Sequence, residues 1–402
     1  MKNILIVSNF IPPEHSATGR IAYSLAKQLG KNNNVHLLCL SSNETIPTDN
    51  EIKINKLLNR YGKYKKRVQN PANRKGIAKI FAKIFYKLYY KYAQKKGLED
   101  NKSHLHLLRK TTKKYIRKNN IDTLITVSNP FELQLVGYYA KKKCPNVKWF
   151  PYLMDSNRHN IKYNTEIDKE RKIFCLAEKL LIVPALCFDE DFCQDFDGKC
   201  EIVDLPIIPT DKPIGIPQKG DIKLLFAGMF YKDVRDPKPL LELMMKLPAN
   251  YNLELYYGGC ADTVKAYEGR LGKRLVANGF ISPQELEEKM SNANILVNIG
   301  NNVLNQVPSK AYDLIATGKP ILNFYQNEED ISLGHLRCYP LCYSMEYRNI
   351  GESEIQALMQ WANGIREEKL DYEKATERLQ GKRLDCVVRR IEQIIQSPEG
   401  SL

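Results

Sequence analysis

The sequence predicts an α/β protein built from two parallel-sheet domains, and three observations support this fold class. At 402 residues the chain is too long for one ordinary hydrophobic core and suits two domains. Apolar strand-like runs alternate with helical patterns along most of its length, which is typical of parallel sheets. Prolines recur every three or four residues between 206 and 217, where they rule out a helix. We therefore expect domains at 1–208 and 209–402.

The N-terminal domain is expected to begin with a strand-helix-strand unit of an open parallel sheet. Apolar runs at 4–7 and 35–40 predict two strands. The helix between them carries Ile21, Leu25 and Leu29 on one face. Further strands of this domain are expected at 123–127, 148–152 and 179–183.

The C-terminal domain repeats the alternation of strands and helices. Strands are expected at 223–230, 252–259, 274–280, 294–300 and 321–325, and helices at 237–247, 283–293, 308–318 and within 353–396. Ligands of open parallel sheets bind beyond the carboxyl ends of the strands. Two such domains facing each other are therefore expected to form a ligand cleft between them.

The composition is that of a globular protein, with 43% hydrophobic and 27% charged residues. No apolar run approaches the roughly 20 residues that span a bilayer, and the first strand is too short and wrongly flanked for a signal peptide. We therefore expect a cytoplasmic protein. The 10 cysteines form no CxxC pair and no zinc-site spacing with histidines, so we expect reduced thiols and no metal.

The net charge of +15 is concentrated in one segment. Residues 60–118 contain 20 lysines and arginines but only 2 acidic residues, so the rest of the chain is nearly neutral. Within 74–96 apolar side chains recur at helical spacing, while lysines recur every four residues on the other side. This pattern predicts a basic amphipathic helix in an insert at about 55–118 of the N-terminal domain.

Three interpretations of this helix are open. Its lysines and aromatic residues favour an anionic membrane surface. A helix that covers the core of the first domain, with a solvated lysine face, is the second interpretation. Nucleic-acid binding is the third, although no recognised motif accompanies the charge. We expect the membrane and no nucleic acid, with contacts from Lys75, Lys79, Phe81, Lys83, Phe85, Lys87, Tyr89 and Lys91.

The stretch "VPSKAYDLIATGKPIL" at 307–322 has the features of an anion-binding helix entrance. Pro308 suits the first turn of a helix, and Ser309 can accept a hydrogen bond from the free amides there. Lys310 adds a cation to the positive end of the helix dipole, which favours a phosphate group. Asp313, one turn in, is an acceptor suited to vicinal ribose hydroxyls. The alternative is an ordinary capped helix with a surface lysine, closed by Gly318.

A second cluster lies in "FAGMFYKDVRDPKPLLELM" at 226–244. Gly228 at a strand end would let a ligand approach the backbone closely. Lys232 and Arg235 follow it, and the arginine fork matches paired phosphate oxygens. Alone, this cluster could equally be a solvated charge patch. Combined with the helix entrance, it predicts a site for a nucleotide-diphosphate sugar.

Three regions resemble the retaining family 4 group of GT-B fold glycosyltransferases, of the bacterial surface-polysaccharide type. They are "FIPPEHSATGRIAYSLAKQL", "FAGMFYKDVRDPKPLLEL", and "FISPQELEEKMSNANILVNIG" followed by "VPSKAYDLIATGKPIL". The resemblance covers most of the chain except about 50–120. It implies two Rossmann-like domains facing across a cleft, a nucleotide sugar such as a UDP-sugar as the donor, and no metal or other cofactor.

The resemblance also implies roles for individual residues. Stabilisation of the leaving diphosphate and contact with the sugar are catalytic roles, which fall to Lys232, Arg235 and Asn305. The donor is bound by Gly19, Arg20, Gly228, Phe280, Ile281, Pro308, Ser309, Lys310 and Asp313, with the base near Phe280 and Ile281. Asn129, Asp155 and His159 follow predicted strands, which places them near the acceptor side, and His15 is a further candidate there. Capping is the alternative for Asn129 and Asp155, while His15 could be an incidental loop residue and Arg20 a solvent-exposed residue at a helix N-terminus.

One position departs from the family pattern. The family usually has two glutamates separated by seven residues, and the corresponding positions here are Asn305 and Asp313. Asp313 keeps a carboxylate for the ribose hydroxyls. Asn305 keeps its hydrogen-bonding capacity towards the sugar but has no charge, so a mechanism that needs a carboxylate there is in doubt.

These features together lead us to expect a retaining glycosyltransferase that moves a sugar from a nucleotide-diphosphate donor to an acceptor. In surface-polysaccharide synthesis that acceptor is a lipid-linked oligosaccharide, so the protein is expected to be peripheral at the inner face of the cell membrane. Two alternatives remain open. A catalytically silent GT-B-like partner subunit is compatible with Asn305, whereas a nucleotide-sugar epimerase would need acid and base residues that we do not find in a convincing set.

Overall fold

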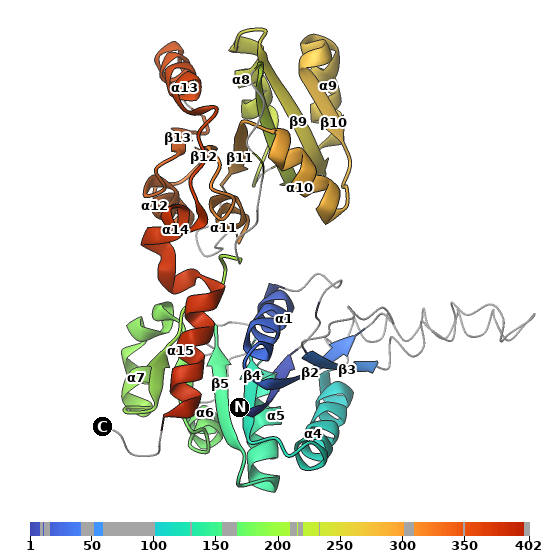
Figure 1. Cartoon of the computed structure of the whole chain (residues 1–402), viewed down its shortest axis with the longest axis vertical. Coiled ribbons are helices and arrows are strands. Elements are labelled where there is room, and N and C mark those ends of the chain that lie inside the picture. The colour runs from blue at the N-terminus through green and yellow to red at the C-terminus, as the bar shows by residue number, and fades with distance from the viewer. Residues whose placement is uncertain are drawn as a thin grey trace, which may run out of the picture. The chain divides into compact units, whose positions relative to one another are not determined.

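The computed structural model describes residues 1–8, 11, 17–41, 52–58, 101–128, 131–154, 167–209, 215, 220–232, 234–300, 309–348 and 350–397. These residues form two compact units (Figure 1). The first contains 1–206 and 384–402, and the second contains 207–383. Each unit is built on one parallel sheet, which confirms the predicted fold class.

The first unit has a 7-stranded sheet in the order β3-β2-β1-β4-β5-β6-β7. Its strands are β1 (Asn3–Ser8), β2 (Asn34–Ser41), β3 (Ile52–Leu58), β4 (Thr123–Val127), β5 (Lys148–Leu153), β6 (Leu180–Ile182) and β7 (Cys200–Ile202). Its helices are α1 (Ala17–Gly30), α4 (Asn101–Lys118), α5 (Glu132–Lys143), α6 (Ile167–Phe174), η2 (Pro184–Phe188), α7 (Glu190–Asp195) and α15 (Leu384–Gln396). Every neighbouring pair of strands is parallel.

The central strands of this sheet are mostly apolar, as expected for parallel strands with helices on both faces. Ile4, Leu5, Ile6 and Val7 are fully buried in β1, where the sequence predicts a strand. On α1, Leu25 and Leu29 are buried as expected, while Ile21 is half-buried. All five strands predicted for this domain are present.

The expected boundaries of the insert and of the second domain are both wrong in part. Residues 52–58 form β3, which pairs with β2, and residues 101–118 form α4, which packs against α5. The expected insert at 55–118 therefore overlaps two elements of the sheet domain. The amphipathic helix expected at 74–96, including Lys75 to Lys91, lies outside the described residues.

The C-terminal helix α15 belongs to the first unit, although the sequence assigns 209–402 to the second domain. The apolar face of α15 is buried in the first core, where Val387 and Ile391 pack beside the elements of β1 and α1. Arg390 forms an ion pair with Glu201 at 2.8 Å, and Glu392 accepts a hydrogen bond from Asn33 at 2.8 Å. Strong amphipathicity predicts that such a helix buries one face, but not which core it joins.

The second unit has a 6-stranded parallel sheet in the order β10-β9-β8-β11-β12-β13. Its strands are β8 (Ile222–Met229), β9 (Tyr251–Gly258), β10 (Leu275–Asn278), β11 (Ile295–Ile299), β12 (Ile321–Tyr325) and β13 (Cys342–Glu346). Its helices are α8 (Lys238–Lys246), α9 (Ala261–Leu271), η3 (Gly272–Arg274), α10 (Pro283–Asn292), α11 (Ser309–Ile315), α12 (Ile331–Arg337), α13 (Glu352–Ile365), α14 (Tyr372–Thr376) and η4 (Glu377–Lys382). Neither β13 nor α9 nor α12 is among the elements predicted from the sequence.

The strand order reverses direction between β8 and β11, which makes their carboxyl ends the switch point of this sheet. The chain leaves β8 towards α8 on one side, and it leaves β11 towards α11 on the other. Ligands of doubly wound sheets bind at this point. The segments after β8 and β11 are therefore where a ligand site is expected in this unit.

Gly318 closes the turn after α11, as predicted, although the helix itself ends at Ile315. Gly318 has φ +71, and a Cβ added there would lie 2.0 Å from the carbonyl oxygen of Leu370, so the turn requires glycine. Lys319 follows and is fully buried. Its Nζ donates to the carbonyl oxygens of Met290, Ser291 and Ala293 at 2.6, 2.6 and 2.7 Å, at the end of α10. One buried lysine thus satisfies the free carbonyls of a helix end. Among the helices of the described residues, none is long and apolar enough to cross a bilayer.

We expect the Lys319→Met substitution to destabilise the protein. The change leaves buried carbonyl oxygens without their ammonium donor, at a cost of about 1 to 3 kcal/mol in the free energy of unfolding. Urea denaturation of the variant measures this loss. Lys289→Met is the control, because Lys289 lies exposed on α10, the helix whose end Lys319 contacts. Equal stabilities of the two variants would contradict the assignment.

Candidate functional site

The segment that leaves β8 carries the first charged group of the site. We call residues 230–237 the Arg235 loop; its Asp233 lies outside the described residues. Two backbone hydrogen bonds join Tyr231 and Arg235: Tyr231 N donates to Arg235 O at 3.0 Å, and Arg235 N donates to Tyr231 O at 2.7 Å. This pairing closes a tight hairpin immediately after the strand, which holds the half-buried Arg235 at the switch point.

The first turn of α11 carries the second cation. Lys310 is half-buried, and its Nζ lies 3.6 Å from the position that a Cβ on Gly228 would occupy. The lysine ammonium therefore lies against the last residues of β8. Because α11 has only 7 residues, the positive charge here comes mainly from side chains and less from the helix dipole.

Buried neighbours fix the orientation of α11. Ala311 and Tyr312 are fully buried, and the Tyr312 hydroxyl lies 2.7 Å from Nδ1 of His335 on α12. Lys310 and Asp313, which flank this buried pair, are half-buried and belong to the opposite side of the turn. The anchoring contacts thus keep the charged residues of α11 at the edge of the sheet.

Arg235, Lys310 and Asp313 interact electrostatically. Burial lowers the pKa of Lys310 to about 8; Asp313 opposes this shift and Arg235 adds to it. Burial also lowers the pKa of Arg235, against the influence of Tyr231 and Asp330. Two cations are therefore held close together and partly out of water. A bound anion would relieve their repulsion, so this arrangement is suited to a phosphate-type ligand.

Two polar residues that the sequence analysis misses complete this edge. Asp330 caps α12 by accepting from the amide of Ser332 at 2.8 Å, and its Oδ2 lies 3.1 Å from where a Cβ on Gly300 would be. Gln326 follows β12 and donates to the carbonyl oxygens of Val234 and Gly300 at 2.6 and 2.8 Å. The signal that could have found Gln326 is its position directly after a predicted strand.

An exposed aromatic ring lies on the other side of β8. Phe280 is 67% exposed, although large apolar side chains are usually buried. A Cβ added to Gly258 would lie 2.8 Å from the Phe280 ring and 2.7 Å from the sulfur of Met229. Glycine at the end of β9 therefore lets the ring pack against the backbone. The neighbouring Ile281 packs towards the core of the unit.

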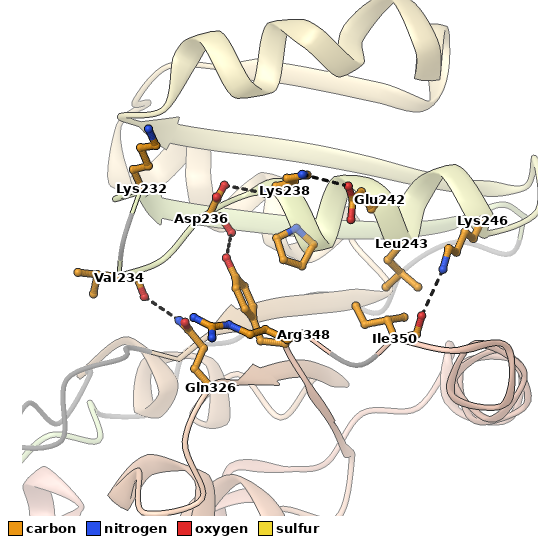
Figure 2. Close-up of a pocket in the computed structure, with 12 residues that line it drawn as sticks. Lys232, Val234, Asp236, Lys238, Glu242, Leu243, Lys246, Gln326, Arg348 and Ile350 are labelled. Atoms are coloured by element: carbon orange, nitrogen blue, oxygen red, sulfur yellow. Dashed lines mark hydrogen bonds and ion pairs between the residues drawn. The ribbon is translucent and has the colours of Figure 1, made fainter.

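Lys232 lies apart from the other cations. It is exposed and lines a groove of about 730 Å³ between α8 and the residues after β13, whose lining includes neither Arg235 nor Lys310 nor Asp313. Figure 2 shows the Lys232 side chain directed away from Gln326 and Arg348. The structure thus brings together Gly228, Arg235, Lys310 and Asp313, but it does not bring Lys232 into their contact.

The remaining expected site residues belong to other places. Gly19 is buried and Arg20 exposed on α1 of the first unit. Ser309 begins α11, although its side chain is not among those described. Six candidates lie outside the described residues, namely His15, Asn129, Asp155, His159, Asn305 and Pro308. Within the described ranges, no group of three or more histidine, cysteine or acidic residues could hold a metal.

Comparisons with known proteins support the fold. No protein-family model and no curated protein sequence matches the chain. Solved structures do match, at low identity and over nearly the whole length of both chains. A glycosyltransferase from Rickettsia africae has a TM-score of 0.57 and 13% identity, with 99% of each chain covered. The UDP-GlcNAc 2-epimerase of Methanocaldococcus jannaschii has a TM-score of 0.56 and 10% identity, with 98% of this chain and 99% of the other covered.

A third solved structure contains ligands. The HepE protein of Anabaena, in complex with UDP and glucose, has a TM-score of 0.51 and 12% identity, with 98% of this chain and 99% of the other covered. These similarities, together with the two parallel sheets, show that the chain has the GT-B fold.

We expect anion binding at this site to weaken as the pH rises through about 8. Lys310 is protonated below its pKa and loses its charge above it, and a bound anion stabilises the charged form. Affinity for UDP, measured by calorimetry between about pH 7 and pH 9.5, should be constant at first and then fall. The Lys310→Met variant should bind more weakly, with no such pH dependence. An identical pH profile for both proteins would show that Lys310 does not contact the anion.

Proposed function

We propose that this protein is a glycosyltransferase that uses a nucleotide-diphosphate sugar. The observation that carries the proposal is the pair of partly buried cations, Arg235 and Lys310, at the switch point of the second sheet. A diphosphate is the ligand class that neutralises two adjacent cations. Asp313 lies within electrostatic reach of Lys310 and supplies an acceptor for ribose hydroxyls, and Phe280 offers an exposed ring for the base.

The same cations would assist the chemistry. When the bond between the sugar carbon C1 and the diphosphate oxygen breaks, negative charge develops on the diphosphate. Arg235 and Lys310 stabilise that charge more strongly in a partly buried site than in water. The acceptor hydroxyl forms the new bond to C1, and its proton passes to the departing diphosphate. Attack on the face that the leaving group vacates retains the configuration, and this route needs neither a carboxylate at Asn305 nor a metal.

The solved structures support the donor class. The Anabaena protein binds UDP and glucose, and the Methanocaldococcus protein is named for a UDP-sugar substrate. Both share the GT-B fold with this chain, so a nucleotide sugar is the ligand class that fits the fold and the charges together. We therefore also propose the retaining type of transfer that the sequence resemblance implies, with Asn305 contacting the sugar through hydrogen bonds.

For the acceptor we propose a lipid-linked oligosaccharide at an anionic membrane surface. The first unit supports this assignment because α4 carries lysines and arginines but no acidic residue. Lys110, Lys114, Arg117 and Lys118 are exposed on it, and the adjacent α5 ends in three lysines, Lys141 to Lys143. Basic surfaces of this kind attract anionic lipid headgroups. The protein would then be peripheral at the inner face of the membrane.

The donor assignment is tested by binding and hydrolysis of a panel of UDP-, GDP- and other nucleotide sugars. At least one should raise the melting temperature and release nucleoside diphosphate. Arg235→Ala should weaken binding of that donor by about 1.5 to 3 kcal/mol, because a charged hydrogen bond is lost. Lys273→Ala, an exposed change remote from this edge, is the control. Stabilisation by no donor would refute the proposal, and binding without turnover would favour the silent partner subunit.

The membrane assignment is tested by cosedimentation with liposomes. The protein should bind vesicles that contain anionic lipid, and not purely zwitterionic ones, with weaker binding at high salt. Reversal of charge at Lys110, Lys114 and Lys118, exposed on α4, should weaken binding. The matched triple reversal at Lys265, Lys273 and Lys289, exposed lysines of the second unit, should not. Absence of binding at low salt would rule out the membrane surface.

A further inference from the structure

The Arg235 loop is fastened on both sides of Arg235 by side chains from neighbouring strand ends. The carbonyl oxygen of Val234 accepts a hydrogen bond from Gln326 Nε2 at 2.6 Å. The carbonyl oxygen of Asp236 accepts a short hydrogen bond from the Tyr347 hydroxyl. Figure 2 shows the first of these bonds, which joins Gln326 to Val234. The residues directly before and after Arg235 are therefore tied to the sheet.

The two donors are themselves well fixed. Gln326 follows β12 and Tyr347 follows β13, and the amide of Tyr347 donates to the carbonyl oxygen of Tyr325 at 2.8 Å. Gln326 makes a second bond to Gly300, at the end of β11. The Arg235 loop is thus hydrogen-bonded, directly or through Gln326 and Tyr347, to the ends of β11, β12 and β13. These three strands are neighbours in the parallel sheet, which fixes their relative positions.

Both side chains have the chemistry that this task requires. The carboxamide of Gln326 has two N–H groups, and each reaches a carbonyl oxygen, whereas a glutamate of the same shape would offer only acceptors. Tyr347 is buried, and burial together with the nearby Asp236 raises the pKa of its hydroxyl, so the group remains a donor. Neither residue belongs to the charged cluster, which leaves alignment of the loop as their contribution.

We propose that Gln326 and Tyr347 are positioning residues that hold the guanidinium of Arg235 in place for the donor diphosphate. The inference rests on the proposed function, because it takes the diphosphate as the ligand of Arg235. Charged groups stabilise a leaving group best when they need no rearrangement during the reaction. One hydrogen bond on each side of Arg235 holds the backbone of the loop, so the backbone need not rearrange when the diphosphate binds.

A first measurement needs no ligand. Hydrogen exchange of the peptide covering the Arg235 loop should be faster in the Gln326→Glu and Tyr347→Phe variants than in the wild type. The control is Tyr343→Phe, which removes a hydroxyl on β13 that donates to Glu354 at 3.5 Å, away from the loop. Unchanged exchange in the first two variants would overturn the inference, whether or not the protein binds a nucleotide.

A second measurement separates positioning from general stability. UDP affinity, measured by calorimetry, should fall about tenfold in Gln326→Glu and in Tyr347→Phe. When either change is added to the Arg235→Ala variant, the affinity of that variant should not fall further. A merely structural effect would weaken binding equally in both backgrounds, and that result would overturn the inference. If the wild type binds none of the nucleotides, the proposed function fails, while the exchange result still decides whether these residues hold the loop.

Discussion

Repulsion between two cations held side by side is the constraint on which the rest of the second unit depends. Arg235 comes from the loop after β8 and Lys310 from the first turn of α11, and both are partly removed from water. Isolated, such a pair lowers stability, and the molecule offsets the repulsion with the nearby carboxylates Asp313 and Asp330. Burial still lowers the pKa of both cations despite these carboxylates, and a bound dianion would add favourable interactions. Clusters of this kind lower stability and are common where proteins bind ligands.

The parallel sheet holds these charged groups in fixed positions. Four adjacent strand ends, those of β8, β11, β12 and β13, each contribute one element to the same edge. The ends provide Gly228, Gly300, Gln326 and Tyr347 in turn. Hydrogen bonds between neighbouring strands fix the spacing of the strand ends. The glycines and hydrogen-bonding side chains at these ends are therefore held at fixed positions beside Arg235 and Lys310. The cores of the second unit consist of apolar side chains, so the strands that form them could be predicted from hydrophobic runs in the sequence.

Much of this architecture could be predicted from the sequence, and the physical reasons differ by residue. The short apolar run from Ile4 to Val7, followed by a loop with prolines, favours a buried strand, and these residues are buried in β1. Gly318 was identifiable because helix ends need a left-handed residue. Gly228, Arg235, Lys310 and Asp313 were identifiable because charged residues after strands converge at one edge.

The rest depends on partners that are distant in the chain. Apart from the position of Gln326 directly after a strand, nothing local distinguishes Gln326 or Tyr347 from ordinary loop residues, since they act only through Val234 and Asp236. Lys232 and Arg235 are three residues apart, yet the hairpin between them separates their side chains. The edge strand β13 is short and half-buried, and its pattern lacks a clear period.

The placement of α15 has a consequence for how the molecule is made. The first unit cannot complete its core until residues 384–396 have been synthesised, after the whole of the second unit. During translation the apolar surface near α1 would stay uncovered while almost 200 further residues are added, about 10 to 40 seconds at common elongation rates. The second unit, which is continuous in the chain, can fold first. Because α15 supplies part of the first core, a chain that stops before residue 384 would leave that hydrophobic surface uncovered.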